Sequence, residues 1–322
     1  MPHILAADIG GTSSRFGFFD APSGGGLRLQ GEIVRLRTGE AASFGGLLAR
    51  LFAEPRPFAA AACDLAALAV PGPVQDGVCV APNIRWRIDL AELGQAGLAR
   101  GALLNDFAAQ AFACRSGALA GAVVLQRGRR PFGVGGVVAV VGAGTGLGHC
   151  ALTPDGRGGL LAVPSEGGHM AFPFVGDAEH AYGEQLRRAA GIPYCHGDAV
   201  VTGSGLARLH EHLTGEALTP AEVGARLERS PRTVEWFARF YGRVARNYAL
   251  AVMALGGVCI SGGVAARNPV LVQHPAFLAE FRSAPSAGHA ELLAGLPVVL
   301  NRDEDFGVHG AALFGMQLLE RD

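Results

Sequence analysis

Apolar residues recur along the chain in two spacings, one typical of strands and the other typical of helices. Short apolar runs such as Leu65–Val70 and Val298–Leu300 predict buried strands. The segment from Ser230-Pro231 to Gly256-Gly257 has apolar residues three or four positions apart, which predicts a long helix with one buried face, capped by Ser230-Pro231. Helical spacing also covers Phe44–Phe52. Both halves of the chain mix strands and helices, which favours an α/β fold.

Two glycine-rich turns each lie between two apolar, strand-like segments. Turn 1 (residues 8–12) lies in a predicted hairpin over 4–20, and turn 2 (residues 142–146) lies in a predicted strand pair over 137–152. Their threonines are 145 − 12 = 133 residues apart, about one domain length. Glycines let backbone N–H groups approach an anion, and a threonine adds a hydroxyl donor. One such turn alone is equally an ordinary hairpin turn, but two at this spacing could hold opposite ends of a polyphosphate and indicate a nucleotide-using enzyme.

The composition removes several other classes of function. All 27 basic residues are arginine, which excludes the lysine of P-loop enzymes, the strand lysine of protein kinases and any Schiff-base mechanism. Charged residues make up only 17% of the chain and the net charge is −1, so no nucleic-acid partner is expected. Phosphate chemistry here must rely on backbone amides, carboxylates, a metal ion and arginine.

The length of 322 residues predicts two domains. The longest apolar stretch, Phe132–Gly148, is rich in glycine and shorter than the roughly 20 residues that span a bilayer, so no membrane partner is expected. The first residues show no signal-peptide pattern. The six cysteines are scattered through apolar segments, which is typical of small buried residues in a protein of a reducing compartment. We therefore expect a cytoplasmic protein.

Candidate chemical groups follow the predicted strands. Asn105-Asp106 ends a short strand before a helical run, which would place the Asp106 carboxylate at the carboxyl end of a strand, where it could accept the proton of an attacking hydroxyl. Capping of the helix that follows is the alternative role of Asp106. Glu166 and His169 flank two glycines in an expected tight turn, and this pair suits vicinal hydroxyls better than zinc. Asp8 could hold Mg²⁺ through water, or could simply stabilise turn 1.

Six motifs in register resemble those of bacterial glucokinases, which share the two-domain, actin-like ATPase (ribonuclease-H-like) α/β fold of hexokinases and sugar kinases. The resemblance covers essentially the whole chain. In chain order the motifs are the first phosphate motif Ala7-Asp8-Ile9-Gly10-Gly11-Thr12, the sugar-side loops with Pro71-Gly72-Pro73 and Asn83…Trp86, the catalytic-base motif Leu104-Asn105-Asp106-Phe107, the second phosphate motif Gly142–Gly148 with Gly142, Gly144 and Thr145, the sugar turn Pro164–His169, and the adenosine motif Ile260-Ser261-Gly262-Gly263-Val264.

The resemblance implies a small α/β domain at 1–105 plus 305–322, a large α/β domain at 106–304, and a ligand site in the cleft between them. It implies transfer of a phosphoryl group from ATP to the 6-hydroxyl of glucose, with Mg²⁺ as cofactor and a homodimer as the assembly. Asp106 would be the general base. The residues that would contact the sugar are Asn83, Asn105, Asp106, Glu166 and His169.

One position departs from the family pattern. Where the family has a further sugar-binding glutamate before a Ser/Thr-Gly helix start, this chain has Asp198, whose carboxylate is one methylene shorter. The strictness of glucose preference is therefore open, and a hexokinase of broader or different sugar specificity is the alternative. A sugar sensor without catalysis is a less favoured alternative because Asp106 is present, and a polyphosphate-using kinase is disfavoured by the lack of basic clustering.

Overall fold

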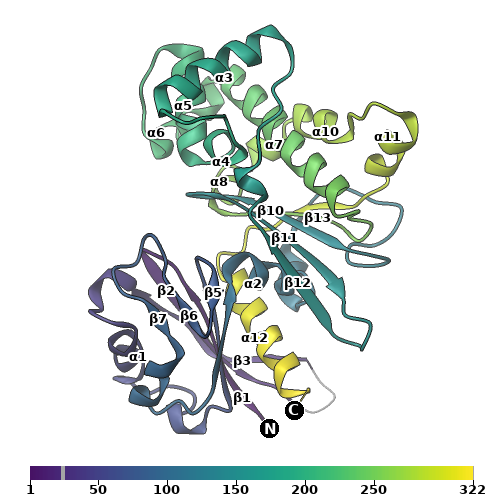
Figure 1. Cartoon of the computed structure of the whole chain (residues 1–322). Coiled ribbons are helices and arrows are strands. Elements are labelled where there is room, and N and C mark those ends of the chain that lie inside the picture. Colours follow the sequence, from purple (N-terminus) through teal and green to yellow (C-terminus); the bar gives the residue numbers. More distant parts are fainter. Residues whose placement is uncertain (23–25, 322) are drawn as a thin grey trace. The chain divides into compact units, whose positions relative to one another are not determined.

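The computed structural model describes residues 1–22 and 26–321, and this part of the chain divides into two compact units (Figure 1). Unit 1 comprises Met1–Ala120, Asp155–Ala162 and Asp303–Asp322, and unit 2 comprises Gly121–Pro154 and Val163–Arg302. Residues 106–120 pack with unit 1, whereas the large domain expected from the sequence begins at residue 106. Whether residues 1–105 plus 305–322 and residues 106–304 fold as separate domains stays a prediction.

Unit 1 is built on a five-stranded sheet of order β3-β2-β1-β4-β8. The three strands β1, β4 and β8 run parallel, whereas β2 and β3 are antiparallel to their neighbours. β1 is apolar at nearly every position because helices cover both faces of the sheet. The strands of unit 1 are β1 (His3–Ile9), β2 (Ser13–Asp20), β3 (Arg28–Arg37), β4 (Leu65–Val70) and β8 (Gly101–Asn105), with a small separate sheet of β5 (Val74–Gln75), β6 (Val78–Cys79) and β7 (Ile88–Asp89).

The helices of unit 1 lie on the two faces of this sheet. α1 covers one face, and α2 and α12 lie side by side against the other (Figure 1). α12 approaches α2 so closely that a Cβ on Gly310 would lie 1.7 Å from the carbonyl oxygen of Ala109, so only glycine fits there. The helices are α1 (Phe44–Phe52), α2 (Asp106–Ala113) and α12 (Phe306–Leu319), with the short 3₁₀ helices η1 (Thr38–Glu40), η2 (Ala60–Ala62), η3 (Leu90–Ala96) and η4 (Gly117–Gly121).

The second sheet has six strands in the order β12-β11-β10-β13-β14-β9. β10, β13 and β14 run parallel, whereas β11 pairs antiparallel with β10 and β9 antiparallel with β14. Its strands are β9 (Val123–Gln126), β10 (Val138–Ala143), β11 (Leu147–Pro154), β12 (Leu160–Ser165), β13 (Gly257–Ser261) and β14 (Val298–Leu300).

The long helix α7 (Pro231–Ala251) forms the centre of the core of unit 2. It begins at Pro231 and ends before Gly256, as predicted. The expected cap by Ser230 is wrong in one respect, because the Ser230 side chain makes no capping hydrogen bond and only Pro231 presets the first turn. The other helices of unit 2 are α3 (Gly176–Ala190), α4 (Gly197–Val200), α5 (Gly203–Thr214), α6 (Pro220–Gly224), α8 (Gly263–Arg267), α9 (Val270–Gln273), α10 (Pro275–Arg282), α11 (Ala287–Ala294), η5 (Gly167–His169) and η6 (Leu227–Arg229).

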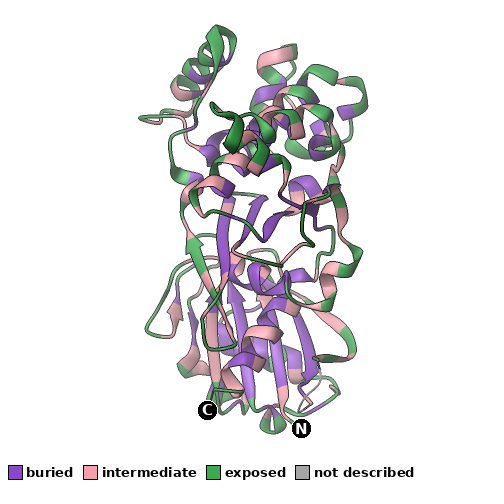
Figure 2. Ribbon diagram, turned by 90° about the vertical axis from the view of Figure 1, so that its right-hand side faces the viewer, coloured by how far each residue is buried: buried purple, intermediate pink, exposed green. Residues whose placement is uncertain are grey.

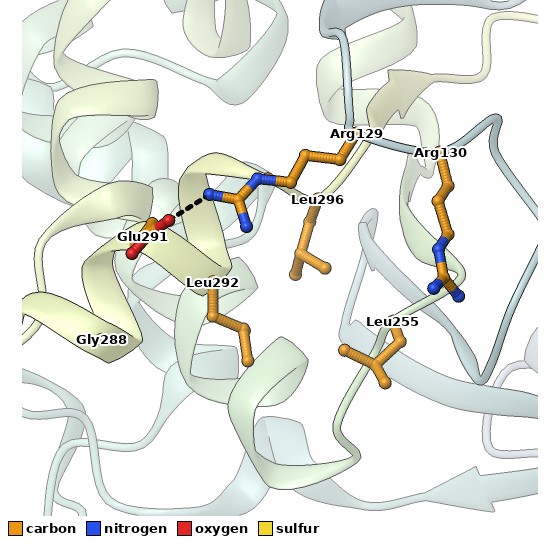
Figure 3. A pocket seen from close by; sticks show the side chains of 8 residues that line it. Arg129, Arg130, Leu255, Gly288, Glu291, Leu292 and Leu296 are labelled. Carbon is orange, nitrogen blue, oxygen red and sulfur yellow. Dashed lines mark hydrogen bonds and ion pairs between the residues drawn. The ribbon is translucent and has the colours of Figure 1, made fainter.

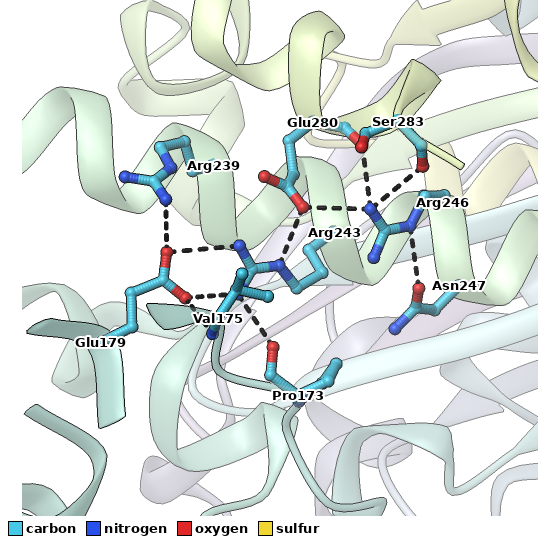
Figure 4. A network of polar contacts seen from close by, with 9 residues as sticks. All are labelled: Pro173, Val175, Glu179, Arg239, Arg243, Arg246, Asn247, Glu280 and Ser283. Carbon is cyan, nitrogen blue, oxygen red and sulfur yellow. Dashed lines mark hydrogen bonds and ion pairs between the residues drawn. The ribbon is translucent and has the colours of Figure 1, made fainter. Parts of the chain in front are cut away.

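A buried ionic network ties three helices of unit 2 together (Figure 4). The guanidinium of Arg243 on α7 donates to Glu179 on α3 at 2.5 Å and to Glu280 on α10 at 2.9 Å. Arg239 donates to the second oxygen of Glu179 at 2.6 Å, and Arg246 donates to Glu280 at 3.0 Å. Because Arg243 and Glu179 are almost fully buried, removing either one alone would leave an uncompensated charge in the core.

Burial follows the strands in each unit (Figure 2), and the predicted mixed α/β fold is confirmed. Five of the six cysteines are buried, and Cys195 is partly exposed. Among residues 1–22 and 26–321, no helix combines the length and the apolar character needed to cross a membrane.

Candidate active site

Turn 1 is held in a fixed shape by its own strand and by Thr38. The N–H of Gly10 donates to the carbonyl of Ser13 at 3.1 Å. The hydroxyl of Thr38 donates to the Gly10 carbonyl at 2.6 Å, and the Thr38 N–H donates to the Thr12 carbonyl at 3.1 Å. With these carbonyls engaged, the turn keeps the tight form that glycine-rich anion-binding loops have.

Asp8 lies directly across the hairpin from Arg15, a residue that the sequence analysis did not select. The guanidinium of Arg15 is 3.6 Å from Asp8, 3.5 Å from Glu304 and 3.6 Å from Asp305. Burial raises the pKa of the Asp8 carboxyl above its usual value, Arg15 opposes this shift, and Asp305 adds to it. Arg15 therefore lies beside turn 1 and forms only long ion pairs with these three carboxylates.

The loop with Asn83 packs directly on turn 1. A Cβ on Gly11 would lie 2.8 Å from the Cβ of Asn83, so a larger residue at position 11 would push the loop away. Two residues that the sequence assigned to different substrates, Gly11 of the phosphate motif and Asn83 of the sugar-side loop, are thus neighbours in unit 1.

The structure shows that Asn105, rather than Asp106, is the N-cap residue of α2. Asn105 is the N-cap of α2, because its Oδ1 accepts from the N–H groups of Phe107 at 3.0 Å and Ala108 at 3.3 Å. Asp106 is the first residue of the helix, and its Oδ1 accepts from the Phe107 N–H at 2.9 Å. The pKa of the Cys79 thiol is raised mainly by burial and, to a smaller extent, by the negative charge of Asp106. Because Asn105 caps the helix, the helix start does not depend on Asp106 alone.

These groups of unit 1 gather at one edge of its sheet. Asp8 stands near the carboxyl end of β1 and Asn105 at the carboxyl end of β8, and β4 runs parallel between them. Ligands of α/β folds bind at the carboxyl ends of parallel strands. Turn 1, Asn83 and Asp106 are therefore placed where a ligand site is expected.

Turn 2 and the adenosine motif lie at the corresponding edge of the second sheet. Gly142 of β10 pairs with Ser261 of β13, and the two strands then separate into the two turns. Within turn 2 the N–H of Gly144 donates to the Gly146 carbonyl at 2.8 Å. Gly262 has φ +85° and its Cβ position is only 2.5 Å from the Ala143 carbonyl oxygen, so both its conformation and its surroundings require glycine. The two predicted nucleotide motifs are in direct backbone contact.

The sugar turn packs against the residue that follows turn 2. A Cβ on Gly168 would lie 2.2 Å from the Leu147 carbonyl oxygen, so the turn rests on the backbone of Leu147. Glu166 and His169 are largely exposed, 3.6 Å apart, and the Tyr194 hydroxyl donates to the His169 carbonyl at 3.1 Å. The predicted tight turn is a 3₁₀ helix, Gly167–His169.

Asp198 also contacts the backbone of Leu147. Its Oδ1 accepts a 2.6 Å hydrogen bond from the N–H of Leu147. Turn 2, the sugar turn and the start of α4 therefore meet around Leu147. The segments that carry Glu166, His169 and Asp198 therefore lie close to the end of turn 2.

A buried histidine supports the sugar turn from behind. His149 lies two residues beyond Leu147 on β11, and its ring is 3.4 Å from the Cβ position of Gly167 and stacks edge-on against Tyr248. Burial lowers the pKa of His149 to about 4, so the ring is neutral at physiological pH. This role could not be predicted from the sequence, since a lone histidine within a strand is most often a core residue with no link to a site.

A cavity of about 370 Å³ lies at the opposite end of the parallel strands of unit 2 (Figure 3). It is lined by leucines and by Arg129 and Arg130, and Arg129 is paired with Glu291 at 2.5 Å. Leu255 of its lining comes just before the start of β13, whereas turn 2 and the adenosine motif follow strand carboxyl ends. The cavity is therefore separate from the candidate active site.

Comparison with known proteins places this fold among the sugar kinases with an actin-like ATPase fold. A solved glucokinase from an Antarctic psychrotroph superposes with a TM-score of 0.80 at 26% identity and covers 98% of this chain and 99% of its own. The glucokinase of Nitrobacter hamburgensis is 33% identical over 278 residues, 82% of either chain. That of Pseudomonas paraeruginosa is 32% identical over 336 aligned positions, which cover 99% of this chain and 94% of the relative.

The family model named Glucokinase matches residues 5–318. The chain therefore belongs to the glucokinase family, enzymes that phosphorylate glucose with ATP as the phosphoryl donor.

Proposed function

We propose that this chain transfers the γ-phosphoryl group of ATP to the 6-hydroxyl of glucose, with Asp106 as the general base. The observation that carries this proposal is the arrangement of two neighbouring residues at the start of α2. Asn105 caps the helix, and Asp106 stands beside it at the carboxyl end of β8. A carboxylate at that position is suited to accept a hydroxyl proton.

The proposed step moves one proton and one phosphoryl group. The 6-hydroxyl oxygen of glucose bonds to the γ-phosphorus as the bond from that phosphorus to the β–γ bridging oxygen breaks. The hydroxyl proton passes to the Asp106 carboxylate, and ADP leaves. Most of the rate of such transfers comes from positioning and electrostatic stabilisation, so the remaining residues are proposed to hold the substrates and offset charge.

Turn 1 and turn 2 are proposed to bind the phosphates through the backbone of Ala7–Thr12 and of Gly142, Gly144 and Thr145, and Gly262 and Gly263 are proposed to contact the adenosine. Arg15 is added to this set, since it is an arginine paired with Asp8 of turn 1 in a chain without lysine. Its loose ion pairs at 3.5–3.6 Å could be exchanged for phosphate oxygens.

Mg²⁺ fits this site as a metal shared with the nucleotide. Within the described residues, no group of three or more His, Cys, Asp or Glu side chains could hold a metal ion by itself. Mg²⁺ commonly takes one or two carboxylates, several waters and substrate phosphates, and Asp8 beside turn 1 offers one such carboxylate. When bound, the ion would neutralise charge on the phosphates.

The sugar is proposed to contact Asn83, Asn105, Glu166, His169 and Asp198. Asn105 uses its carbonyl oxygen for the helix cap, so its sugar contact would come from its NH₂ group. A cytoplasmic location and a homodimeric assembly remain part of the proposal.

A broader hexose specificity is the second candidate, and the geometry of Asp198 favours considering it. One oxygen of this carboxylate is engaged by the backbone N–H of Leu147. A shorter carboxylate with one oxygen already hydrogen-bonded is proposed to discriminate less between sugar hydroxyls than an unengaged glutamate would.

A coupled assay tests both candidates. ADP release would be followed with Mg-ATP and, in separate reactions, glucose, mannose, fructose and glucosamine, and with polyphosphate in place of ATP. Turnover on glucose well above the other sugars supports the first candidate, and comparable turnover on several sugars supports the second. Glucose binding without turnover on any donor would instead indicate a sugar sensor.

A further inference from the structure

Tyr241 connects the two nucleotide motifs of unit 2 through a single buried hydroxyl. It lies in the middle of α7 and is fully buried. Its Oη accepts a hydrogen bond from the N–H of Ala143 at 3.0 Å and donates to the carbonyl of Ser261 at 3.2 Å. Ala143 belongs to turn 2, and Ser261 is the second residue of the adenosine motif.

These two backbone groups stand where a sheet comes apart. The parallel pairing of β10 with β13 ends at Gly142 and Ser261, and beyond this pair the two chains diverge into separate turns. A buried N–H and a buried C=O at such a fork need partners, because leaving either unsatisfied is costly. A hydroxyl can donate and accept at once, so that of Tyr241 satisfies both groups and continues the ladder by one step.

The two turns also meet directly at this fork, with no room for a side chain at position 262. Gly262 meets Ala143 backbone to backbone, with its Cβ position 2.5 Å from the Ala143 carbonyl oxygen. The ring of Tyr241 is held edge-on between Phe237 and Phe277, which fixes where its hydroxyl points. The Tyr241 hydroxyl is therefore a fixed point to which the backbone of both turns is hydrogen-bonded.

We propose that Tyr241 is a positioning residue for the nucleotide: it fixes the spacing between turn 2 and the Gly262-Gly263 turn, so that both ends of one ATP molecule can be bound at once. This inference rests on the proposed function, in which turn 2 binds phosphate and the Gly262-Gly263 turn binds adenosine. A ligand that contacts both turns gains affinity from their fixed spacing, whereas a ligand that contacts only one turn does not.

The test compares Tyr241→Phe with Tyr182→Phe. Tyr182 is equally buried in the same core, but its hydroxyl has no hydrogen-bond partner within the described residues, so it is a matched control for removing a buried phenol oxygen. Dissociation constants would be measured by calorimetry for Mg-ATP, AMP, magnesium tripolyphosphate and glucose, together with the KM values of ATP and glucose in the wild type and both variants.

The expected result is selective for the intact nucleotide. Tyr241→Phe should weaken Mg-ATP binding and raise the KM for ATP roughly tenfold, the effect of one lost buried hydrogen-bonding group. AMP, tripolyphosphate and glucose should each bind within about threefold of wild type, since each contacts one turn or none. Tyr182→Phe should match the wild type with every ligand.

Two results would overturn the proposal. One is an unchanged ATP affinity in Tyr241→Phe, and the other is an equal loss of all four ligands, which would mean that the hydroxyl only supports the fold. If Tyr241→Phe does not fold, Phe277→Leu loosens one of the two rings that hold Tyr241 in place and should show a smaller loss that is again selective for ATP. A wild type that binds ATP but does not phosphorylate glucose would refute the proposed function while leaving the binding comparison valid.

Discussion

The carboxylate of Asp198 accepts a 2.6 Å hydrogen bond from the backbone N–H of Leu147, the first residue after turn 2. The same oxygen lies 2.9 Å from the Cβ position of Gly146, so glycine at that position is what allows the approach. Asp198 is thus a brace between α4 and the end of a phosphate turn, as well as a candidate sugar contact. A residue with both roles should couple the binding of the two substrates.

Variants of Asp198 separate these roles. Asp198→Ala removes the acceptor of the Leu147 N–H and should raise the KM of both glucose and ATP about tenfold, the effect of roughly 1–2 kcal/mol. Asp198→Asn keeps an acceptor oxygen and loses only the charge, so it should raise the KM of glucose while the KM of ATP stays within about twofold. A matrix of initial rates over both substrates measures this. An unchanged KM for ATP in Asp198→Ala would show that the brace does not support turn 2.

Two helical glycines offer a matched test of packing in unit 1 and unit 2. Gly310→Ala would force a methyl group to within 1.7 Å of the Ala109 carbonyl at the crossing of α12 and α2. We expect it to lower the free energy of unfolding by about 1–3 kcal/mol or more. Gly288→Ala in α11 meets nothing within 4 Å and should leave stability unchanged or raise it by up to about 1 kcal/mol. Urea denaturation of both variants decides this, and similar effects at the two positions would contradict the packing described.

The buried imidazole of His149 makes stability depend on pH. Its folded-state pKa is about 4, against 6.5 for an exposed histidine, so the unfolded chain binds more protons between these values. Its contribution is fully present above pH 6.5 and is lost as the pH falls towards 4. At pH 5 this group alone should lower the free energy of unfolding by about 2 kcal/mol relative to pH 7.

The measurement compares His149→Gln with His180→Gln, an exposed histidine of α3. The loss of stability between pH 7 and pH 5 should be about 2 kcal/mol smaller in His149→Gln than in the wild type, and unchanged in His180→Gln. An equal loss in all three proteins would show that His149 is protonated freely in the folded state.

Sequence patterns identified the elements whose signals are local. Phe44–Phe52 and Leu65–Val70 fold with the predicted bounds, because helical spacing in one and an unbroken apolar run in the other are properties of a few neighbouring residues. The two glycine turns likewise carry their signal in five residues each. β12 is not predicted from the sequence; it is an edge strand, and two of its apolar residues, Leu161 and Val163, are exposed.

The residues that were missed depend on partners far along the chain or across a hairpin. Arg15 gains its place from the register that sets it opposite Asp8. Tyr241 fits the apolar face of α7, and only the fold reveals that its hydroxyl reaches Ala143, 98 positions away in sequence. The capping role of Asn105 also needed the structure, because asparagine and aspartate are both common capping residues and the two stand next to each other in the sequence.

The substitution Asp106→Asn tests the central claim most directly, with Asp89→Asn as its control. Asp89 ends the strand β7 and caps the helix η3, accepting from the Ala91 N–H at 2.9 Å, so its variant shows what loss of a capping carboxylate does by itself. The account predicts that Asp106→Asn lowers kcat roughly a hundredfold to ten-thousandfold, with the dissociation constant of glucose within about threefold of wild type, while Asp89→Asn keeps normal turnover. A kcat in Asp106→Asn within tenfold of the wild-type value would contradict the assignment of Asp106 as the general base.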